Sequence, residues 1–301
     1  MQKVHKKLLV LIIIAINFIG IMVSFGAGVS NAQTSSTAST KDRLQAIKEK
    51  GVLTVASAND KPFAYIDPQT NKFIGIDAEI ITEVARRLGI DKVEMKYVPF
   101  ENLLTELNKN NDIDIATDGL YVTDERKKEV LFTNVLYKEP EVIIIPKVTK
   151  FNFKEDLKDA VVGAQNKTVF LDLAREWEKE GLVKKIKILE SQSELILAVA
   201  NGEVDAGITD SLAVAYILSK DNNLKLKIVN PYKPEIPGMV SAAVKKTDAT
   251  FADEVNKKID EMKEDRTLTG ILKKYGLNES NFVSIKDGHI LDQWGKLLYM
   301  V

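Results

Sequence analysis

The sequence contains no cysteine and only two histidines among its 301 residues. Without cysteine there is no disulfide, no cysteine nucleophile and no zinc–thiolate site. His5 lies near the N-terminus and His289 near the C-terminus, so the body of the chain cannot supply a histidine-containing triad or a histidine-rich metal site. We therefore expect no metal site and no cofactor.

An excess of positive charge is also missing. Lys and Arg together number 42 and Asp and Glu 43, which gives a formal net charge of −1. A nucleic-acid-binding protein needs basic residues to neutralise phosphates, so the balance argues against a nucleic-acid partner. The 45% hydrophobic and 28% charged content is that of a globular protein with one large domain or two modest ones.

A long hydrophobic run occurs at the N-terminus, over residues 8–29, behind the basic stretch "MQKVHKK". The run ends in small residues at Ser30 and Ala32, which is typical of a cleaved signal peptide. We predict a signal peptide over 1–32, with an uncleaved membrane anchor as the alternative. A lipid anchor on cysteine is excluded. The polar residues 33–42 are predicted to form a flexible spacer, and either interpretation places the remaining chain outside the cytoplasmic membrane.

Behind the spacer, strand patterns alternate with helical patterns in two successive stretches, which predicts parallel α/β units in both halves of the chain. In such sheets ligands bind beyond the carboxyl ends of the strands, where turns lead into helices. Two α/β lobes that face each other would enclose a ligand cleft. The polar turns that end predicted strands lie at 57–63, 117–126, 165–169 and 209–211.

Several segments resemble those of one protein family. The chain is similar to the extracellular solute-binding proteins of polar amino-acid ABC importers (family 3, the glutamine- and histidine-binding type). The resemblance covers about residues 43–280 and follows the family's order. The matching segments are "GVLTVASANDKPF", "FIGIDAEIITEVARRLG", "VPFENLLTELNKNNDIDIATDGLYVTDERKKEVLFTNVLY", "VVGAQNKTVF", "NGEVDAGITD" and "LTGILKKYG".

This resemblance implies an α/β, periplasmic-binding-protein-like fold of type II, in which two lobes close around a ligand about a hinge of two segments. Lobe 1 would comprise 43–140 and 238–283 and lobe 2 would comprise 141–237, with a C-terminal extension at 284–301. The implied function is capture of a polar amino acid or a derivative and its delivery to an ABC permease in the membrane. We expect a monomer without enzymatic activity and without catalytic residues.

The resemblance assigns two charged residues to the ligand's α-amino and α-carboxylate groups. Arg126 matches the arginine that clamps the α-carboxylate, because its planar fork forms two charge-assisted hydrogen bonds. The alternative is a surface arginine paired with Glu129 or Asp124. Asp210 matches the acid that pairs with the ligand ammonium, while an N-cap role for the helix behind it is the alternative. Both roles of Asp210 could coexist.

In the second half of the chain, Thr168 matches a threonine of an anion-binding turn. Its hydroxyl and the backbone N–H of Val169 are expected to meet the carboxylate. Lys167 stands where the family often has glycine, which leaves the geometry of this turn open. Gln165 is either a side-chain contact or an exposed loop residue.

The resemblance places two aromatic residues, Phe100 and Phe63, around the ligand side chain, although an aromatic residue in a turn is also a common core anchor. Gly119 belongs to the turn that lines the cleft. Two departures stand beside it: Tyr121 replaces a small hydroxyl residue, and Asp118 replaces a small residue. Asp118 either caps the turn or binds an additional cationic or hydrogen-bond-donating group of the ligand.

Two other classes of function remain open. The first is an enzyme, because periplasmic cyclohexadienyl dehydratases resemble these binding proteins and use a buried carboxylic acid as general acid. The second is a sensor or scaffold module that an unprocessed N-terminus anchors to the membrane.

Overall fold

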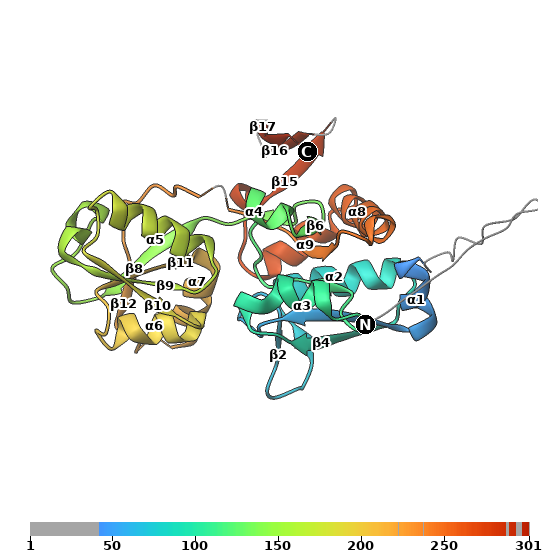
Figure 1. Ribbon diagram of the computed structural model, residues 1–301, viewed down its shortest axis with the longest axis horizontal. Coiled ribbons are helices and arrows are strands. Elements are labelled where there is room, and N and C mark those ends of the chain that lie inside the picture. Colours follow the sequence, from blue (N-terminus) through green and yellow to red (C-terminus); the bar gives the residue numbers. More distant parts are fainter. Residues whose placement is uncertain (1–41, 222, 237, 287–288, 293–296, 301) are drawn as a thin grey trace, which may run out of the picture. The chain divides into compact units, whose positions relative to one another are not determined.

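The computed structural model describes residues 42–221, 223–236, 238–286, 289–292 and 297–300 (Figure 1). The predicted signal peptide or anchor and nearly all of the predicted spacer lie outside the described residues. Among the residues that are described, no helix is long and apolar enough to cross a membrane.

The first sheet combines strands from the early part of the chain with one strand from its late part. β1 pairs in parallel with β4 and β5, whereas β14 runs antiparallel to β5 and to β6. We call the part of the molecule that is built on this sheet lobe 1. Across the sheet the strands are β4 (Lys92–Tyr97), β1 (Val52–Ser57), β5 (Ile115–Ala116), β14 (Ala243–Lys245) and β6 (Val130–Phe132).

Helices cover both faces of this sheet because alternate strand residues point to opposite sides. In β1, Val55 belongs to the cluster that contains residues of α1, α2 and α8, while Ala56 belongs to the cluster of α3. The amphipathic α2 buries Ile80, Ile81 and Val84 at helical spacing. The helices are α1 (Arg43–Lys50), α2 (Ile76–Arg87), η1 (Phe100–Asn102), α3 (Leu103–Lys109), α4 (Asp124–Lys127), α8 (Ala249–Glu264) and α9 (Thr267–Lys274).

The second sheet uses only strands between residues 141 and 228 and defines lobe 2. Its order is β10 (Lys185–Leu189), β9 (Val161–Gln165), β11 (Ala206–Asp210), β8 (Glu141–Pro146) and β12 (Leu226–Ile228). α5 packs on β9 and β10 on one side, and α6 lies on the other side (Figure 1). The helices are η2 (Lys154–Asp159), α5 (Val169–Lys179), α6 (Gln192–Ala200) and α7 (Ser211–Lys220).

The prediction of parallel sheets is correct for three strands in each lobe and wrong for the others. β8 runs antiparallel to β11, and β12 runs antiparallel to β8. The segment "MVSAAVKK" forms two strands, β13 (Met239–Val240) and β14, which belong to different sheets. The strands with reversed direction are β8 and β14, which follow the two connecting segments into their sheets.

Two antiparallel segments connect the lobes. β7 (Tyr137–Lys138) pairs with β13, and the N–H of Glu139 donates to the carbonyl of Gly238 at 2.7 Å. Gly238 has a φ of +64°, and a β-carbon there would lie 1.7 Å from the carbonyl oxygen of Glu139. Glycine is therefore required where the two segments touch.

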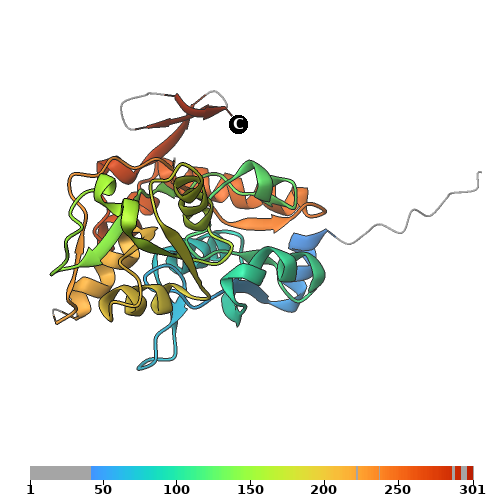
Figure 2. The same cartoon turned by 60° about the vertical axis from the view of Figure 1, so that its left-hand side comes forward.

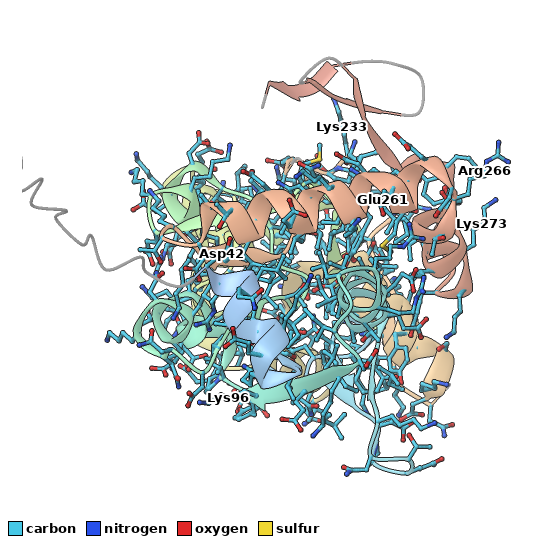
Figure 3. The ribbon with its side chains drawn as sticks, turned by 90° about the vertical axis from the view of Figure 1, so that its right-hand side faces the viewer. Asp42, Lys96, Lys233, Glu261, Arg266 and Lys273 are labelled. Atoms are coloured by element: carbon cyan, nitrogen blue, oxygen red, sulfur yellow. The ribbon has the colours of Figure 1, made fainter. Side chains whose placement is uncertain are left out.

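Smaller elements complete the described chain. β2 (Tyr65–Ile66) and β3 (Phe73–Ile74) form an antiparallel hairpin. At the C-terminus η3 (Glu279–Asn281) leads into the sheet of β15 (Val283–Lys286), β16 (His289–Asp292) and β17 (Leu297–Met300), which is visible in Figures 1 and 2. Charged side chains of both signs, such as Glu261 on α8 and Lys273 on α9, project from the ribbon (Figure 3), in keeping with the balanced composition.

Candidate functional site

The predicted carboxylate clamp stands at the beginning of a short helix. Thr123 caps α4, because its hydroxyl accepts the N–H of Arg126 at 3.1 Å. The Arg126 guanidinium donates to the carbonyl of Tyr121 at 2.7 Å and, across the lobes, to the carbonyl of Lys167 at 3.0 Å. It also lies 5.7 Å from the ring centroid of Phe100. Among the described residues, both of its hydrogen-bond acceptors are therefore neutral carbonyls.

The alternative of a surface ion pair is not what this arginine forms. In the described part of the chain Arg126 makes no ion pair with Glu129 or Asp124, and Asp124 instead lies 3.5 Å from Lys127. Burial lowers the pKa of Arg126 to about 10, against the opposing influence of Asp172 and Glu129. A half-buried guanidinium that binds only carbonyls retains the capacity to bind a carboxylate.

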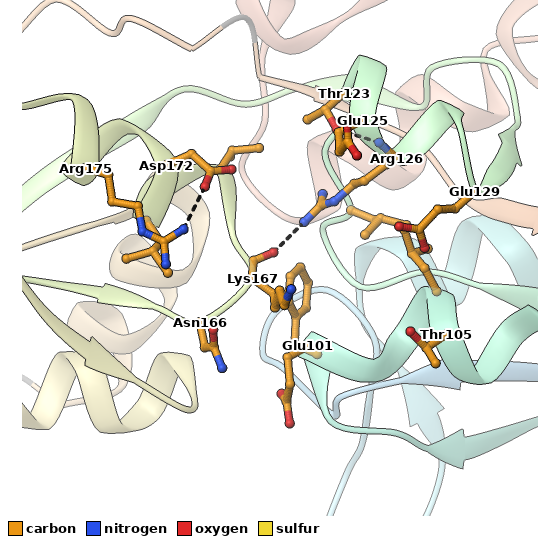
Figure 4. A pocket seen from close by; sticks show the side chains of 15 residues that line it. Glu101, Thr105, Thr123, Glu125, Arg126, Glu129, Asn166, Lys167, Asp172 and Arg175 are labelled. Atoms are coloured by element: carbon orange, nitrogen blue, oxygen red, sulfur yellow. Dashed lines mark hydrogen bonds and ion pairs between the residues drawn. The ribbon is translucent and has the colours of Figure 1, made fainter.

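A pocket of about 350 Å³ opens beside Arg126 and is lined by residues of both lobes (Figure 4). Of the predicted ligand residues, Arg126, Phe100 and Val169 line it. Figure 4 shows the Arg126 side chain directed toward the backbone of Lys167. The other predicted residues lie outside this lining.

Asp210 ends β11 and caps α7 with its own side chain. One carboxylate oxygen accepts the N–H of Ala213 at 2.9 Å, and the other accepts the amide of Gln192 at 2.6 Å. Burial raises the pKa of Asp210 to about 6. The capping alternative is thus present in the structure, and the proposed ligand role would add to it.

The lobe 2 turn before α5 is arranged as a helix cap. The Thr168 hydroxyl donates to the Gln165 carbonyl at 2.6 Å and accepts the N–H of Leu171 at 3.2 Å. Lys167 has a φ of +59°, a conformation that glycine adopts most easily. Gln165 is buried rather than exposed. Val169 begins α5 and reaches the pocket beside Arg126.

The two departures from the family pattern have different surroundings. Tyr121 is buried, its ring meets Phe170 edge-on at 5.4 Å, and its hydroxyl donates to the Glu139 carbonyl at 2.9 Å. The hydroxyl therefore contacts the connecting segment and not the clamp. Phe63 lies in the core, where its ring atoms would be 3.1 Å from a β-carbon at Gly119.

Asp118 follows β5 and lies against the turn that follows β1. Its Oδ2 accepts the N–H of Ala58 at 2.7 Å, whereas its Oδ1 is buried and has no hydrogen-bond partner among the described residues. Burial, reinforced by the neighbouring Asp60, raises the pKa of Asp118 well above its ordinary value. Burial and Asp210 raise the pKa of Asp60 to about 7.

The structure thus groups three acids from strand ends, Asp60, Asp118 and Asp210, which affect one another's pKa. Separately, it brings Arg126 and Val169 to one pocket. Asp60 was missed by the sequence reasoning. Its place in a polar turn at the end of β1 was the available signal, since neighbouring parallel strands end at one edge of a sheet. Within the described residues no group of acidic or histidine side chains is placed to hold a metal ion.

The chain has two α/β lobes joined by paired connecting segments, and charged turns at strand ends contact each other across the lobes. These features define a two-lobe solute-binding protein. Residues 53–278 match the bacterial extracellular solute-binding proteins, family 3, and the chain belongs to that family.

The relatives are amino-acid-binding proteins. The chain is 30% identical over 273 residues to the L-cystine-binding protein TcyA of Bacillus subtilis (strain 168), which covers 90% of this chain and 97% of the relative. An ancestral arginine-binding protein bound to arginine is 30% identical, with a TM-score of 0.67 over 75% of this chain and 98% of its own. The ancestral amino acid-binding protein AncCDT-1, a precursor of cyclohexadienyl dehydratase, is 26% identical, with a TM-score of 0.67 over 78% and 99%.

Proposed function

We propose that this protein binds a polar α-amino acid or a close derivative between its lobes and presents it to an ABC permease. The observation that carries the proposal is the position of Arg126. Its guanidinium is half-buried between the lobes and, among the described residues, engages carbonyls and no carboxylate. Asp210, at the end of a lobe 2 strand, supplies the acid for the ligand ammonium.

The proposed site comprises ten residues. Arg126, Thr168 and the N–H of Val169 bind the carboxylate, and Asp210 binds the ammonium. The rest shape the space around the ligand side chain: Gly119, Tyr121, Asp118, Phe100, Phe63 and Gln165. For Thr168, ligand contact requires its hydroxyl to leave the Gln165 carbonyl, because that bond and the cap now occupy it.

A thermal-shift screen of the α-amino acids tests this proposal. A ligand that binds only the folded protein at about 100 times its Kd stabilises it by about 2.7 kcal/mol, which is a readily measured shift in Tm. We expect a shift with at least one polar α-amino acid and none with the matching amino alcohol, which lacks the carboxylate. The absence of any shift across the panel would reject the amino-acid site.

We further propose that the protein does not catalyse a reaction. AncCDT-1 is described as a precursor of an enzyme, and the raised pKa of Asp118 is a property that a general acid needs. The charged pair of Arg126 and Asp210 favours retention of an amino acid instead. Incubation of purified protein with prephenate or arogenate, followed by product analysis, tests this, because turnover would establish the enzyme.

The location outside the cytoplasm follows from the family, and we propose that residues 1–32 act as a signal peptide. We also propose that the two lobes move relative to each other, lobe 1 being residues 43–140 with 238–283 and lobe 2 being residues 141–237, with 284–301 as an extension. The protein is proposed to act as a monomer. Mass determination of the mature secreted chain distinguishes cleavage after Ala32 from an uncleaved anchor.

A further inference from the structure

Three acidic side chains at three strand ends act on one another electrostatically. Asp118 follows β5, Asp60 follows β1, and Asp210 ends β11 in the other lobe. β1 and β5 are parallel neighbours, so their carboxyl ends lie at the same edge of the sheet. The hydrogen bond from the Ala58 N–H to Asp118 holds the carboxyl group against the turn that carries Asp60.

One oxygen of this group has no role within the described chain. Asp118 is 2% exposed, its Oδ2 completes the turn after β1, and its Oδ1 accepts no hydrogen bond. Capping of the turn therefore explains one oxygen and leaves the other unsatisfied. A buried acceptor without a donor is unfavourable, and a donor from outside the chain would satisfy it.

The charges around Asp118 are all negative. The groups that act on its carboxyl are Asp60 and Asp77, and Asp60 is in turn affected by Asp210. Asp77 is already satisfied, because it accepts hydrogen bonds from Thr117, Gly119 and Tyr137. A positive charge placed between Asp60 and Asp118 would allow both carboxyl groups to ionise.

We propose that Asp60 and Asp118 form a subsite for a second ammonium group, carried by the side chain of the α-amino acid ligand. This inference rests on the proposed function, in which Arg126 binds the α-carboxylate and Asp210 binds the α-ammonium. The ligand class is therefore an α-amino acid with an amine in its side chain, because a neutral donor could satisfy the Asp118 oxygen but would not supply the positive charge that allows both carboxyl groups to ionise.

Calorimetric titration with matched ligand pairs tests the subsite. Ornithine is compared with norvaline, and lysine with norleucine, because each pair differs mainly in the side-chain amine. We expect the diamino member of at least one pair to bind about tenfold tighter or more, as for a desolvated charge pair. In Asp118→Asn, which keeps an oxygen for the Ala58 N–H, the ratio should fall to within about threefold.

Asp205→Asn is the matched control. This acid precedes β11 and accepts the Val161 N–H at 2.8 Å, at the opposite end of the strand from Asp210. The ligand ratio should be the same in this variant as in the unmodified protein. An unchanged ratio in Asp118→Asn would overturn the subsite, and so would an equal loss in both variants.

Proton release provides a second measurement that needs no variant. Titration in two buffers of different ionisation enthalpy gives the number of protons released on binding. The diamino ligand should release about one proton more than its neutral partner at pH 7, because Asp60 and Asp118 ionise beside it. Equal release would overturn the subsite.

The outcomes separate the two proposals. Equal binding of the neutral and diamino members of both pairs removes the second subsite and leaves the amino-acid site intact. Failure of every α-amino acid to bind removes both.

Discussion

Replacement of Arg126 by alanine is expected to abolish most of the ligand affinity. The guanidinium lies between the lobes, and its two hydrogen bonds to the carbonyls of Tyr121 and Lys167 show the direction in which its fork points. Truncation of one partner of a buried, hydrogen-bonded charge pair costs about 2–5 kcal/mol. This corresponds to a Kd that rises by a factor of about 30 to several thousand.

Calorimetry with the best ligand from the screen measures the effect, and Arg175→Ala is the matched control. Arg175 lines the same pocket, but its side chain is 57% exposed and pairs with Asp172 at 3.4 Å. Exposed ion pairs contribute about 0–1 kcal/mol, so the control should change the Kd by about fivefold at most. A large effect confined to position 126 would identify a specific contact and exclude a general effect of pocket charge.

Arg126→Lys separates charge from geometry. Lysine keeps the positive charge and loses the bidentate fork, so its Kd should fall between those of the alanine variant and the unmodified protein. Each variant must first show a cooperative thermal transition, because removal of the two carbonyl contacts lowers stability by about 0.5–1.5 kcal/mol per bond. A folded Arg126→Ala protein that binds within about threefold of the original would refute the carboxylate clamp.

Three further predictions concern the hinge, the acids and the lobe 2 turn. Gly238→Ala should lower the free energy of unfolding by about 1–3 kcal/mol, because the new methyl group would collide with the Glu139 carbonyl. Urea unfolding measures this, and an unchanged urea midpoint would contradict it. The pKa of Asp60 is raised from 3.8 to about 7, so the folded state loses stability as pH rises from about 4 to 7. Asp60→Asn should therefore raise the Tm of the unliganded protein at pH 8 and leave it nearly unchanged at pH 4. Equal Tm shifts at both pH values would argue against a buried, charged pair with Asp210. Thr168→Ala should cost about 0.5–2 kcal/mol of stability through the lost cap while Thr168→Ser restores it, and equal stabilities would show that the cap contributes nothing.

The elements that could be predicted from the sequence are those with a strong local pattern. The apolar spacing of α2 and the glycine that follows α1 mark both helices, because amphipathic periodicity and a left-handed C-cap are local properties. Strands of two or three residues, such as β6 and β7, carry no such pattern. The reversed direction of β14 depends on pairing with strands more than a hundred residues away, which the local sequence does not encode.

The same distinction applies to the site. The resemblance to the family singled out Asp118 and Asp210, and the rule that ligands bind at the carboxyl ends of strands agrees with it, because Asp210 ends β11 and Asp118 lies two residues after β5. Asp60 is significant because Asp118 and Asp210, 58 and 150 positions later, interact with it electrostatically in the folded chain. The unsatisfied oxygen of Asp118 likewise becomes visible only when the position of every donor around it is known.

The bond between Arg126 and the Lys167 carbonyl suggests how a ligand would join the two lobes. In the structure a neutral carbonyl of lobe 2 accepts from the lobe 1 guanidinium. A carboxylate is the stronger acceptor, because it is ionised and can accept two parallel N–H···O bonds from the planar fork, whereas a carbonyl offers one neutral oxygen. An arriving amino acid can therefore displace the carbonyl at a net gain. The left-handed backbone of Lys167 is what presents that carbonyl, so the position where the sequence departs from glycine also sets the contact that a ligand must replace.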